Sequence, residues 1–100
     1  MQELLADSTI LIADDEPSIR DLLRDILEPE GATVKLAKSG TEALKMIGEE
    51  EPDLAILDVR MPPPDGLAVL QQLRTQGNDL PVLIITANDS STVTIEAMQR

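Results

Sequence analysis

Three short apolar runs, each followed by a polar residue, constrain the fold of this chain more than any other feature. The runs and their followers are Ile10–Ala13 with Asp14 and Asp15, Leu54–Leu57 with Asp58, and Val82–Ile85 with Thr86. Runs of four aliphatic residues are typical of strands that are covered on both faces in a parallel sheet. The sequence therefore predicts a sheet that lies between layers of helices.

Amphipathic segments separate these strands. After Pro17, apolar residues recur at helical spacing, and they are Ile19, Leu22, Leu23, Ile26 and Leu27. A second helix is expected after the capping-box pair Ser39 and Glu42, ending at Gly48 and the Glu49–Pro52 run. A third is expected to carry Leu67, Leu70 and Leu73.

Two further elements complete the prediction. Ala32–Ala37 is expected to be a short strand, and a fourth helix is expected to start at Asp89 or Ser90 and run to Arg100. Strands that alternate with helices imply right-handed βαβ units. We therefore expect one α/β domain over residues 1–100, with a doubly wound parallel sheet.

Composition excludes several classes of function. Nineteen acidic and eight basic residues give a net charge of −11, which opposes contact with nucleic acids or anionic membranes. The chain has no cysteine, histidine or aromatic residue, so thiolate catalysis, cysteine-based metal sites and base stacking are excluded. No apolar run reaches the length of a membrane span. We expect a cytoplasmic protein with no membrane partner and no direct nucleic-acid partner.

The polar residues after the strands indicate a metal site. In open parallel sheets, ligands bind beyond the carboxyl ends of the strands. Asp14, Asp15 and Asp58 would repel one another there unless a cation lay between them, and an all-oxygen site with few protein ligands suits Mg²⁺. A functional role is favoured for Asp58, because a carboxylate at the end of an apolar run costs solvation unless it is paired or metal-bound, but the other strand-end residues also have simpler explanations. Asp14 and Asp15 are equally well explained as helix N-caps, and Thr86 as a common strand residue.

Three ordered segments resemble the signatures of response-regulator receiver domains, the CheY-like modules of two-component signalling. The segments are Ile10–Pro17 (ILIADDEP), Leu57–Gly66 (LDVRMPPPDG) and Pro81–Ala87 (PVLIITA). The resemblance covers essentially the whole chain, and it implies a flavodoxin-like sheet of order 2-1-3-4-5.

The resemblance also assigns roles to residues. Asp58 would accept a phosphoryl group from the phosphohistidine of a histidine kinase or phosphotransfer protein, in a Mg²⁺-dependent reaction that controls a downstream output. Asp15 would bind the metal directly, Asp14 would position it partly through water, and the Arg60 carbonyl would be a further ligand. Thr86 would supply the hydroxyl that hydrogen-bonds the phosphoryl group. At most, the chain would catalyse its own phosphorylation and dephosphorylation.

The C-terminal part departs from the family pattern. Family members continue into a fifth strand, which carries a lysine and an aromatic residue, and a fifth helix. None of Lys35, Lys38 and Lys45 is a candidate replacement. We therefore expect an incomplete domain of order 2-1-3-4, in which Val82–Ile85 forms an open edge that favours a homodimer.

Three other functions are alternatives to phosphoacceptance. A non-phosphorylated receiver fold that acts as a protein interaction module is the main alternative, and the absent lysine favours it. Phosphatases with an aspartate nucleophile usually have a second aspartate where Arg60 stands. A flavodoxin-like FMN protein would need a hydroxyl- and glycine-rich loop after the first strand, where this chain has Asp-Asp-Glu-Pro.

Overall fold

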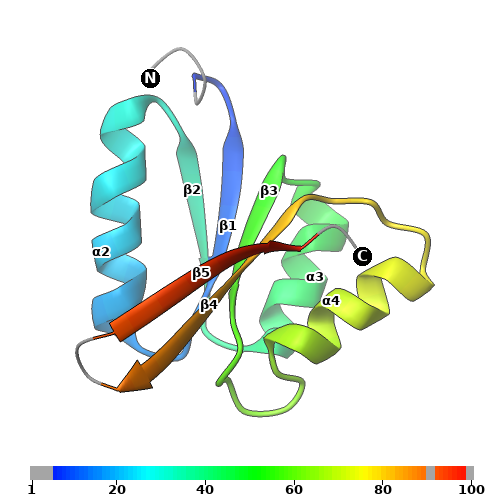
Figure 1. The fold of residues 1–100 in the computed structure, drawn as a ribbon. Helices are drawn as coiled ribbons and strands as arrows, with labels where there is room; N and C mark the ends of the chain where they lie inside the picture. Colours follow the sequence, from blue (N-terminus) through cyan, green and yellow to red (C-terminus); the bar gives the residue numbers. More distant parts are fainter. Residues whose placement is uncertain (1–5, 90–91, 99–100) are drawn as a thin grey trace.

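A five-stranded sheet with helices on both faces forms the protein (Figure 1). The computed structural model describes residues 6–89 and 92–98, with side chains described up to residue 85. In chain order the elements are β1 (Thr9–Ala13), α2 (Pro17–Leu27), the 3-10 turn η1 (Glu28–Glu30), β2 (Thr33–Ala37), α3 (Gly40–Glu50), β3 (Leu54–Asp58), α4 (Gly66–Thr75), β4 (Val82–Asp89) and β5 (Thr92–Met98).

The sheet has the order β2-β1-β3-β4-β5, and its first four strands are parallel. Helix α2 covers one face, while α3 and α4 lie against the other (Figure 1). This arrangement confirms the predicted doubly wound α/β class and the strand order 2-1-3-4. It also places the carboxyl ends of β1, β3 and β4 at the same end of the sheet.

Alternating residues of the central strands build two hydrophobic layers. On the α3 and α4 face, the core includes Leu11, Ala13, Ala55, Leu57, Val82 and Ile84 together with helix residues Ala43, Ile47, Val69, Leu70 and Leu73. On the α2 face, it includes Ile10, Ile12, Ile56 and Ile85, with Leu23 and Leu27 packed against them. The aliphatic runs are therefore buried because helices cover both sides, as their sequences predict.

Helix α3 begins with the predicted cap and ends within the predicted run. The Ser39 hydroxyl accepts a hydrogen bond from the Glu42 backbone N–H at 3.1 Å, while the Glu42 carboxylate accepts one from the Lys38 N–H at 2.9 Å. The predicted end, at Gly48 and the Glu49–Pro52 run, is confirmed within that run. The helix continues to Glu50 and stops where Glu51 takes a left-handed conformation, φ 46°, immediately before Pro52.

The predicted fourth helix, from Asp89 or Ser90 to Arg100, is wrong for the part that the structure describes. Asp89 ends β4, and residues 92–98 form β5, which pairs antiparallel with β4 from Val82↔Met98 to Asp89↔Thr92. Ser90 and Arg100 lie outside the described residues. The segment Thr-Val-Thr-Ile at 92–95 explains why a strand forms in place of the helix. Its β-branched residues favour a strand, and β4 offers unpaired backbone groups with which it can pair.

This pairing corrects a second prediction. Val82–Ile85 was expected to be an open edge that recruits a second chain, but β5 occupies that edge over its whole length. The backbone donors and acceptors that would have favoured a dimer are used within the chain. The homodimer predicted through this edge therefore loses its structural basis.

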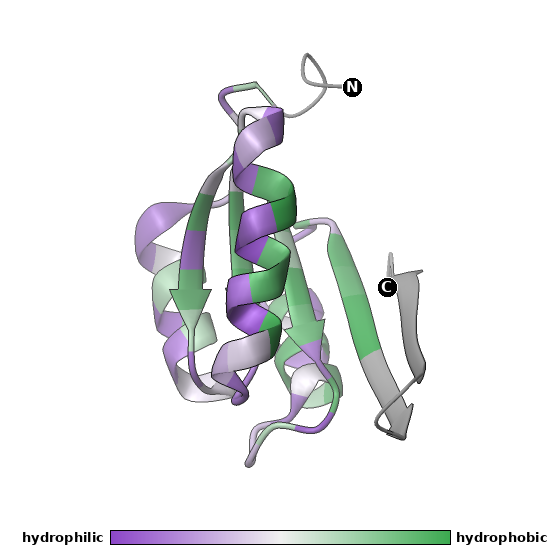
Figure 2. Ribbon diagram, turned by 90° about the vertical axis from the view of Figure 1, so that its left-hand side faces the viewer, coloured by the Kyte–Doolittle hydropathy of each residue, from purple (hydrophilic) through white to green (hydrophobic). Residues whose placement is uncertain are grey.

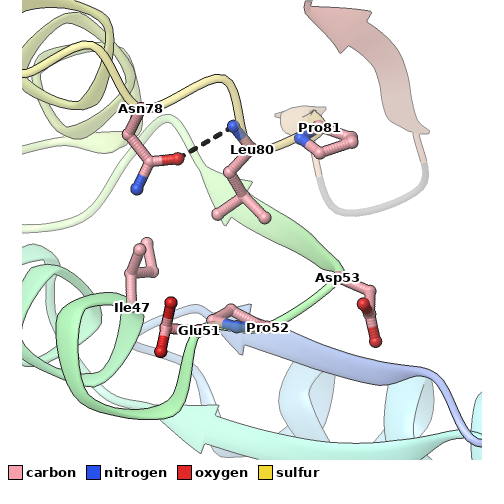
Figure 3. A pocket seen from close by; sticks show the side chains of 7 residues that line it. All are labelled: Ile47, Glu51, Pro52, Asp53, Asn78, Leu80 and Pro81. Carbon is pink, nitrogen blue, oxygen red and sulfur yellow. Dashed lines mark hydrogen bonds between the residues drawn. The ribbon is translucent and has the colours of Figure 1, made fainter.

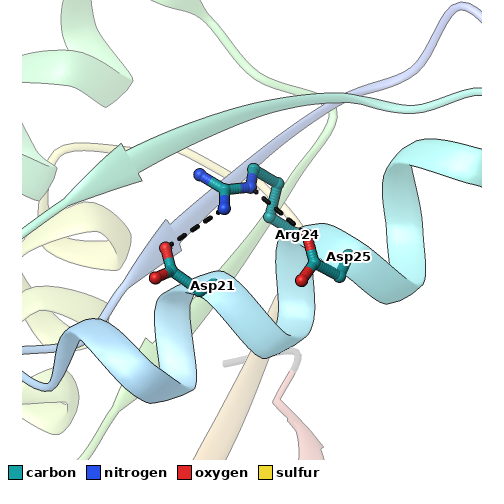
Figure 4. A network of polar contacts seen from close by, with 3 residues as sticks. All are labelled: Asp21, Arg24 and Asp25. Atoms are coloured by element: carbon teal, nitrogen blue, oxygen red, sulfur yellow. Dashed lines mark ion pairs between the residues drawn. The ribbon is translucent and has the colours of Figure 1, made fainter.

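The outer surface of α2 combines ion pairs with exposed leucine and isoleucine side chains. Figure 2 shows hydrophobic residues along one side of this helix and hydrophilic residues along the other. Leu22 and Ile26 are about half exposed, at 54% and 53%. Arg24 pairs with Asp21 at 3.3 Å and with Asp25 at 3.6 Å (Figure 4). Exposed pairs of this kind add little stability.

Within the described part of the chain, none of the helices combines the length and the apolar character that a membrane span requires.

Candidate functional site

Three carboxylates meet where β1 and β3 end. Asp14 directly follows β1 and Asp58 is the last residue of β3, and these strands pair in parallel with Ala13 opposite Leu57. Asp15 follows Asp14 in the loop before α2. One oxygen from each of the three carboxylates lies within 4.8 Å of the other two. The structure thus brings together the aspartates that the sequence predicted to share one site.

The backbone holds two of these side chains in fixed orientations. Asp14 and Asp58 are buried, with 2% and 8% of their surface exposed, whereas Asp15 is exposed. An Asp14 carboxylate oxygen accepts a hydrogen bond from the Glu16 N–H at 2.9 Å. An Asp58 carboxylate oxygen accepts one from the Arg60 N–H at 3.0 Å. Each aspartate therefore bonds the N–H two residues ahead, which fixes its direction after the strand ends.

The explanation of Asp14 and Asp15 as helix N-caps does not hold. The N-cap of α2 is Glu16, and no side chain caps this helix end by a hydrogen bond. Instead, the Asp14 carboxylate accepts a hydrogen bond from the Glu16 N–H. The Asp14 backbone carbonyl accepts one from the Arg20 guanidinium at 2.7 Å. The two aspartates are thus held by the turn that leads into the helix, with their carboxylates beside Asp58.

Burial and nearby negative charges change the pKa of Asp14. Burial, together with the neighbouring carboxylates of Asp58 and Asp15, raises the pKa of this carboxyl from its usual 3.8 to about 7, against the hydrogen bond from the Glu16 N–H, which lowers it. Among the described residues, the ion pairs involve Arg24 and Lys35 and none reaches this cluster. Clustered carboxylates with no cationic side chain paired to them fit a hard divalent cation such as Mg²⁺.

Glycine at two positions allows the loops to approach the site closely. A Cβ added to Gly66, the first residue of α4, would overlap the backbone carbonyl of Asp58. A Cβ added to Gly40 would overlap the carbonyl of Pro64, which lies in the same loop after β3. Gly66 is the last residue of a segment that resembles a receiver signature, but sequence reasoning missed Gly40. The sequence gives no signal there beyond a glycine at a helix start.

Two predicted site features remain predictions. Thr86 lies in β4, directly after Ile85, which pairs in register with Asp58, but its side chain is outside the described part of the chain. Arg60 lies two residues beyond Asp58 and donates its N–H to that carboxylate. A role for the Arg60 carbonyl as a metal ligand is not tested by this contact.

A comparison with protein families decides what kind of domain this is. The family described as "Response regulator receiver domain" matches residues 10–100. The chain belongs to the response-regulator receiver family. Response regulator MprA of Mycobacterium ulcerans is 52% identical over 81 residues, which is 81% of this chain and 35% of that protein. The receiver chain thus spans about a third of the length of the curated relatives that it matches.

Solved receiver structures share the fold. The Francisella response regulator 1452 receiver domain superposes with a TM-score of 0.79 at 34% identity, covering 85% of this chain and 70% of that one. Response regulator protein TrrA from Thermotoga maritima, solved in complex with Mg(2+)-BeF, gives a TM-score of 0.77 at 40% identity and covers 82% and 71%. The receiver fold is therefore shared with proteins of substantial sequence identity.

Stability in the absence of divalent cations is expected to fall as the pH rises toward 7. Because folding raises the pKa of Asp14 from 3.8 to about 7, the folded state favours the protonated carboxyl. That contribution is complete below the unfolded pKa and is lost as the pH rises through the folded pKa. Thermal melts in EDTA across this range measure it. Asp14→Asn should show a smaller fall than the unmodified chain, and an equal fall would contradict the assignment.

Proposed function

We propose that this receiver domain is a phosphoacceptor module, in which Asp58 accepts a phosphoryl group from a histidine kinase or phosphotransfer protein. The observation that carries the proposal is the cluster of Asp14, Asp15 and Asp58, with carboxylate oxygens within 4.8 Å of one another. A purely structural role would not require three like charges around a buried position, since their repulsion destabilises the fold.

The chain's own residues supply a nucleophile and a metal-binding set. A carboxylate oxygen of Asp58 forms a bond to phosphorus while the bond from phosphorus to the histidine nitrogen breaks, and the histidine leaves with the electron pair of that bond. The Arg60 N–H orients the Asp58 carboxylate. No protein base is needed, because a carboxylate nucleophile has no proton to lose when it attacks.

Mg²⁺ would be held by Asp14, Asp15 and Asp58, with the Arg60 carbonyl as a further ligand. When bound, the ion would offset the repulsion between the attacking carboxylate and the phosphoryl oxygens. The TrrA relative was solved with Mg(2+)-BeF, which supports the choice of metal for this site.

Intact mass after incubation with acetyl phosphate tests phosphoacceptance directly. With Mg²⁺ we expect a gain of one phosphoryl group, and with EDTA in place of Mg²⁺ we expect none. Acetyl phosphate replaces the kinase, so the test does not depend on finding the cognate partner. The absence of any gain with saturating Mg²⁺ would contradict the proposal for this chain.

One observation favours the alternative, a receiver fold that acts as an interaction module without phosphorylation. The three lysines of the chain lie in β2, in α3 and in the turn that joins them, and Lys35 pairs with Glu50 at 3.7 Å. The family pattern has the lysine that contacts the phosphoryl group on its fifth strand, and β5 of this chain, Thr92–Met98, contains no lysine. Mg²⁺ binding without phosphorylation would be the signature of this alternative.

Mg²⁺ is expected to stabilise the fold. A ligand that binds only the native state at ten times its Kd adds about 1.4 kcal/mol, which corresponds to about 5–10 °C in Tm for a domain of this size. Thermal melts with and without Mg²⁺ measure the shift. Asp15→Asn removes an exposed member of the cluster and should reduce the shift, whereas Glu16→Gln changes the adjacent exposed acid and should not. Equal shifts in all three proteins would argue against a shared metal site.

A further inference from the structure

Arg20 reaches from α2 back to the turn at the end of β1. Its guanidinium donates a hydrogen bond to the Asp14 backbone carbonyl at 2.7 Å. Within the described part of the chain, no other donor bonds to this carbonyl, which belongs to a residue with 2% of its surface exposed. An ionised donor strengthens such a bond, and a buried carbonyl without a partner is costly. The guanidinium therefore holds the Asp14 peptide group in one orientation.

This contact closes a ring of three hydrogen bonds. The Asp14 carboxylate accepts the Glu16 N–H at 2.9 Å, and the Glu16 carbonyl accepts the Arg20 N–H at 3.2 Å. The bond from the Arg20 guanidinium to the Asp14 carbonyl completes the ring. Glu16 is the N-cap of α2, and no side chain caps this helix end by a hydrogen bond. The ring takes the place of such a cap and ties the start of α2 to the end of β1.

The position of Asp15 depends on the same ring. A peptide group is planar, so the Asp14 carbonyl and the Asp15 N–H share one plane, and a fixed carbonyl fixes the start of the Asp15 backbone. Asp15 is exposed, and among the residues that the structure describes no hydrogen bond or ion pair reaches its carboxylate. That carboxylate nevertheless lies within 4.8 Å of those of Asp14 and Asp58. Its place in the cluster therefore comes from the backbone that Arg20 holds.

We propose that Arg20 is a positioning residue for the metal site, acting through the peptide group between Asp14 and Asp15. A guanidinium has donors and no acceptor, so Arg20 supplies no ligand atom. It presets the spacing of the two carboxylates, which reduces the reordering that Mg²⁺ binding requires. The inference rests on the proposed function, because it assigns Arg20 to the Mg²⁺ site of the phosphoacceptor reaction.

Arg74 makes the same kind of contact at the opposite end of the sheet. Its guanidinium donates to the Asn78 carbonyl at 2.9 Å, in the segment that leads from α4 to β4. Asn78 lines a cavity of about 380 Å³ there, and its carboxamide oxygen accepts the Leu80 N–H at 2.9 Å (Figure 3). Arg74 thus provides a matched arginine that holds a turn remote from the carboxylate cluster.

Mg²⁺ titrations followed by NMR test the proposal, since the chain has no aromatic residue to report binding by fluorescence. Arg20→Met removes the donor but keeps an unbranched apolar stem, and its Kd for Mg²⁺ should rise about 10-fold. Arg24→Met removes the same charge one turn further along α2, where Arg24 pairs with Asp21 and Asp25. Its Kd should stay within about 2-fold, because exposed charges at that distance are screened. Equal Kd values in these two variants would overturn the proposal.

Two further measurements separate positioning from stability. In EDTA, the carbonyl-carbon resonance of Asp14 should shift in Arg20→Met and not in Arg74→Met, because it reports the hydrogen bond to that carbonyl. The Tm should fall in both variants, since each loses a charge-assisted hydrogen bond, but the Kd for Mg²⁺ should rise only in Arg20→Met. A lower Tm with an unchanged Kd in Arg20→Met would assign Arg20 to the fold alone and overturn the proposal.

Arg20→Lys is a milder variant that carries the test if Arg20→Met does not fold. Lysine keeps the charge and a donor on a shorter side chain without the planar fork of arginine. Its Kd for Mg²⁺ should therefore lie above that of the unmodified chain and below that of Arg20→Met. A Kd equal to that of the unmodified chain, with Arg20→Met unfolded, would contradict the positioning role.

Phosphorylation by acetyl phosphate distinguishes failure of this inference from failure of the proposed function. In Arg20→Met, half-maximal phosphorylation should require about 10-fold more Mg²⁺, whereas the rate at saturating Mg²⁺ should change much less. An unmodified chain that neither binds Mg²⁺ nor gains a phosphoryl group would contradict both proposals. An unmodified chain that does both, with the same Mg²⁺ dependence in Arg20→Met, would overturn the role of Arg20 alone.

Discussion

Replacing Asp58 with asparagine is expected to abolish phosphorylation of the chain by acetyl phosphate. Asparagine has almost the same shape, so the hydrogen bond from the Arg60 N–H can persist through the amide oxygen. The neutral amide is not a nucleophile for phosphorus, and it leaves only Asp14 and Asp15 to bind the metal. Intact mass spectrometry in the presence of Mg²⁺ should show one added phosphoryl group on the unmodified chain and none on the variant.

Asp65→Asn is the matched control for this experiment. Asp65 caps α4 by accepting the Ala68 N–H at 2.8 Å, and asparagine is an equally good N-cap. This variant should therefore gain the phosphoryl group as the unmodified chain does. Asp58→Asn should also melt no lower than the unmodified chain without metal, since it removes one of three clustered charges. A phosphoryl group retained on Asp58→Asn would refute the assignment of Asp58.

Local sequence patterns predicted most of the fold because they match the environment of each element. The run Leu54–Leu57 is aliphatic throughout and is covered on both faces, as such a run requires. The helical spacing after Pro17 corresponds to α2, which ends at Leu27. These features depend on neighbours in the sequence and on a simple rule of burial. They could be recognised without knowing which strands pair.

The C-terminal segment shows where such patterns fail. The sequence around Asp89 and Ser90 is compatible with a helix cap, and the family pattern also favours a helix there. The β-branched residues at 92–95 favour a strand only if a partner edge is available. The structure supplies that edge in β4. The outcome depends on a tertiary contact, which the segment's own sequence does not encode.

The proximity of the clustered aspartates could be predicted from the sequence, but their energetics could not. Parallel topology places Asp14 and Asp58 at the ends of paired strands, so their proximity follows from the strand order. The raised pKa of Asp14, however, depends on its burial and on the distance to other charges. The close approach of Gly40 to Pro64 likewise depends on how the loop after β3 packs against α3. Neither can be read from sequence spacing.

Gly66→Ala is expected to destabilise the domain by about 1–3 kcal/mol, the usual cost of forcing extra volume into a packed position. The added methyl group would overlap the Asp58 carbonyl, which is backbone and cannot rotate away as a flexible side chain could. Gly66 does not have a positive φ, so the cost is steric rather than conformational. Since relief requires movement of the Asp58 backbone, the rate of phosphorylation by acetyl phosphate should fall as well.

Gly48→Ala provides the opposite result on the same chain. Gly48 is an exposed residue inside α3, and an added Cβ would meet nothing within 4 Å. Alanine is favoured over glycine in a helix interior by up to about 1 kcal/mol, so this variant should be more stable than the unmodified chain and should be phosphorylated at the same rate. Urea unfolding and a phosphorylation time course measure both properties. Equal stability and equal phosphorylation rates in the two variants would contradict this account. They would mean that the close packing of α4 against the Asp58 backbone does not position the phosphoacceptor.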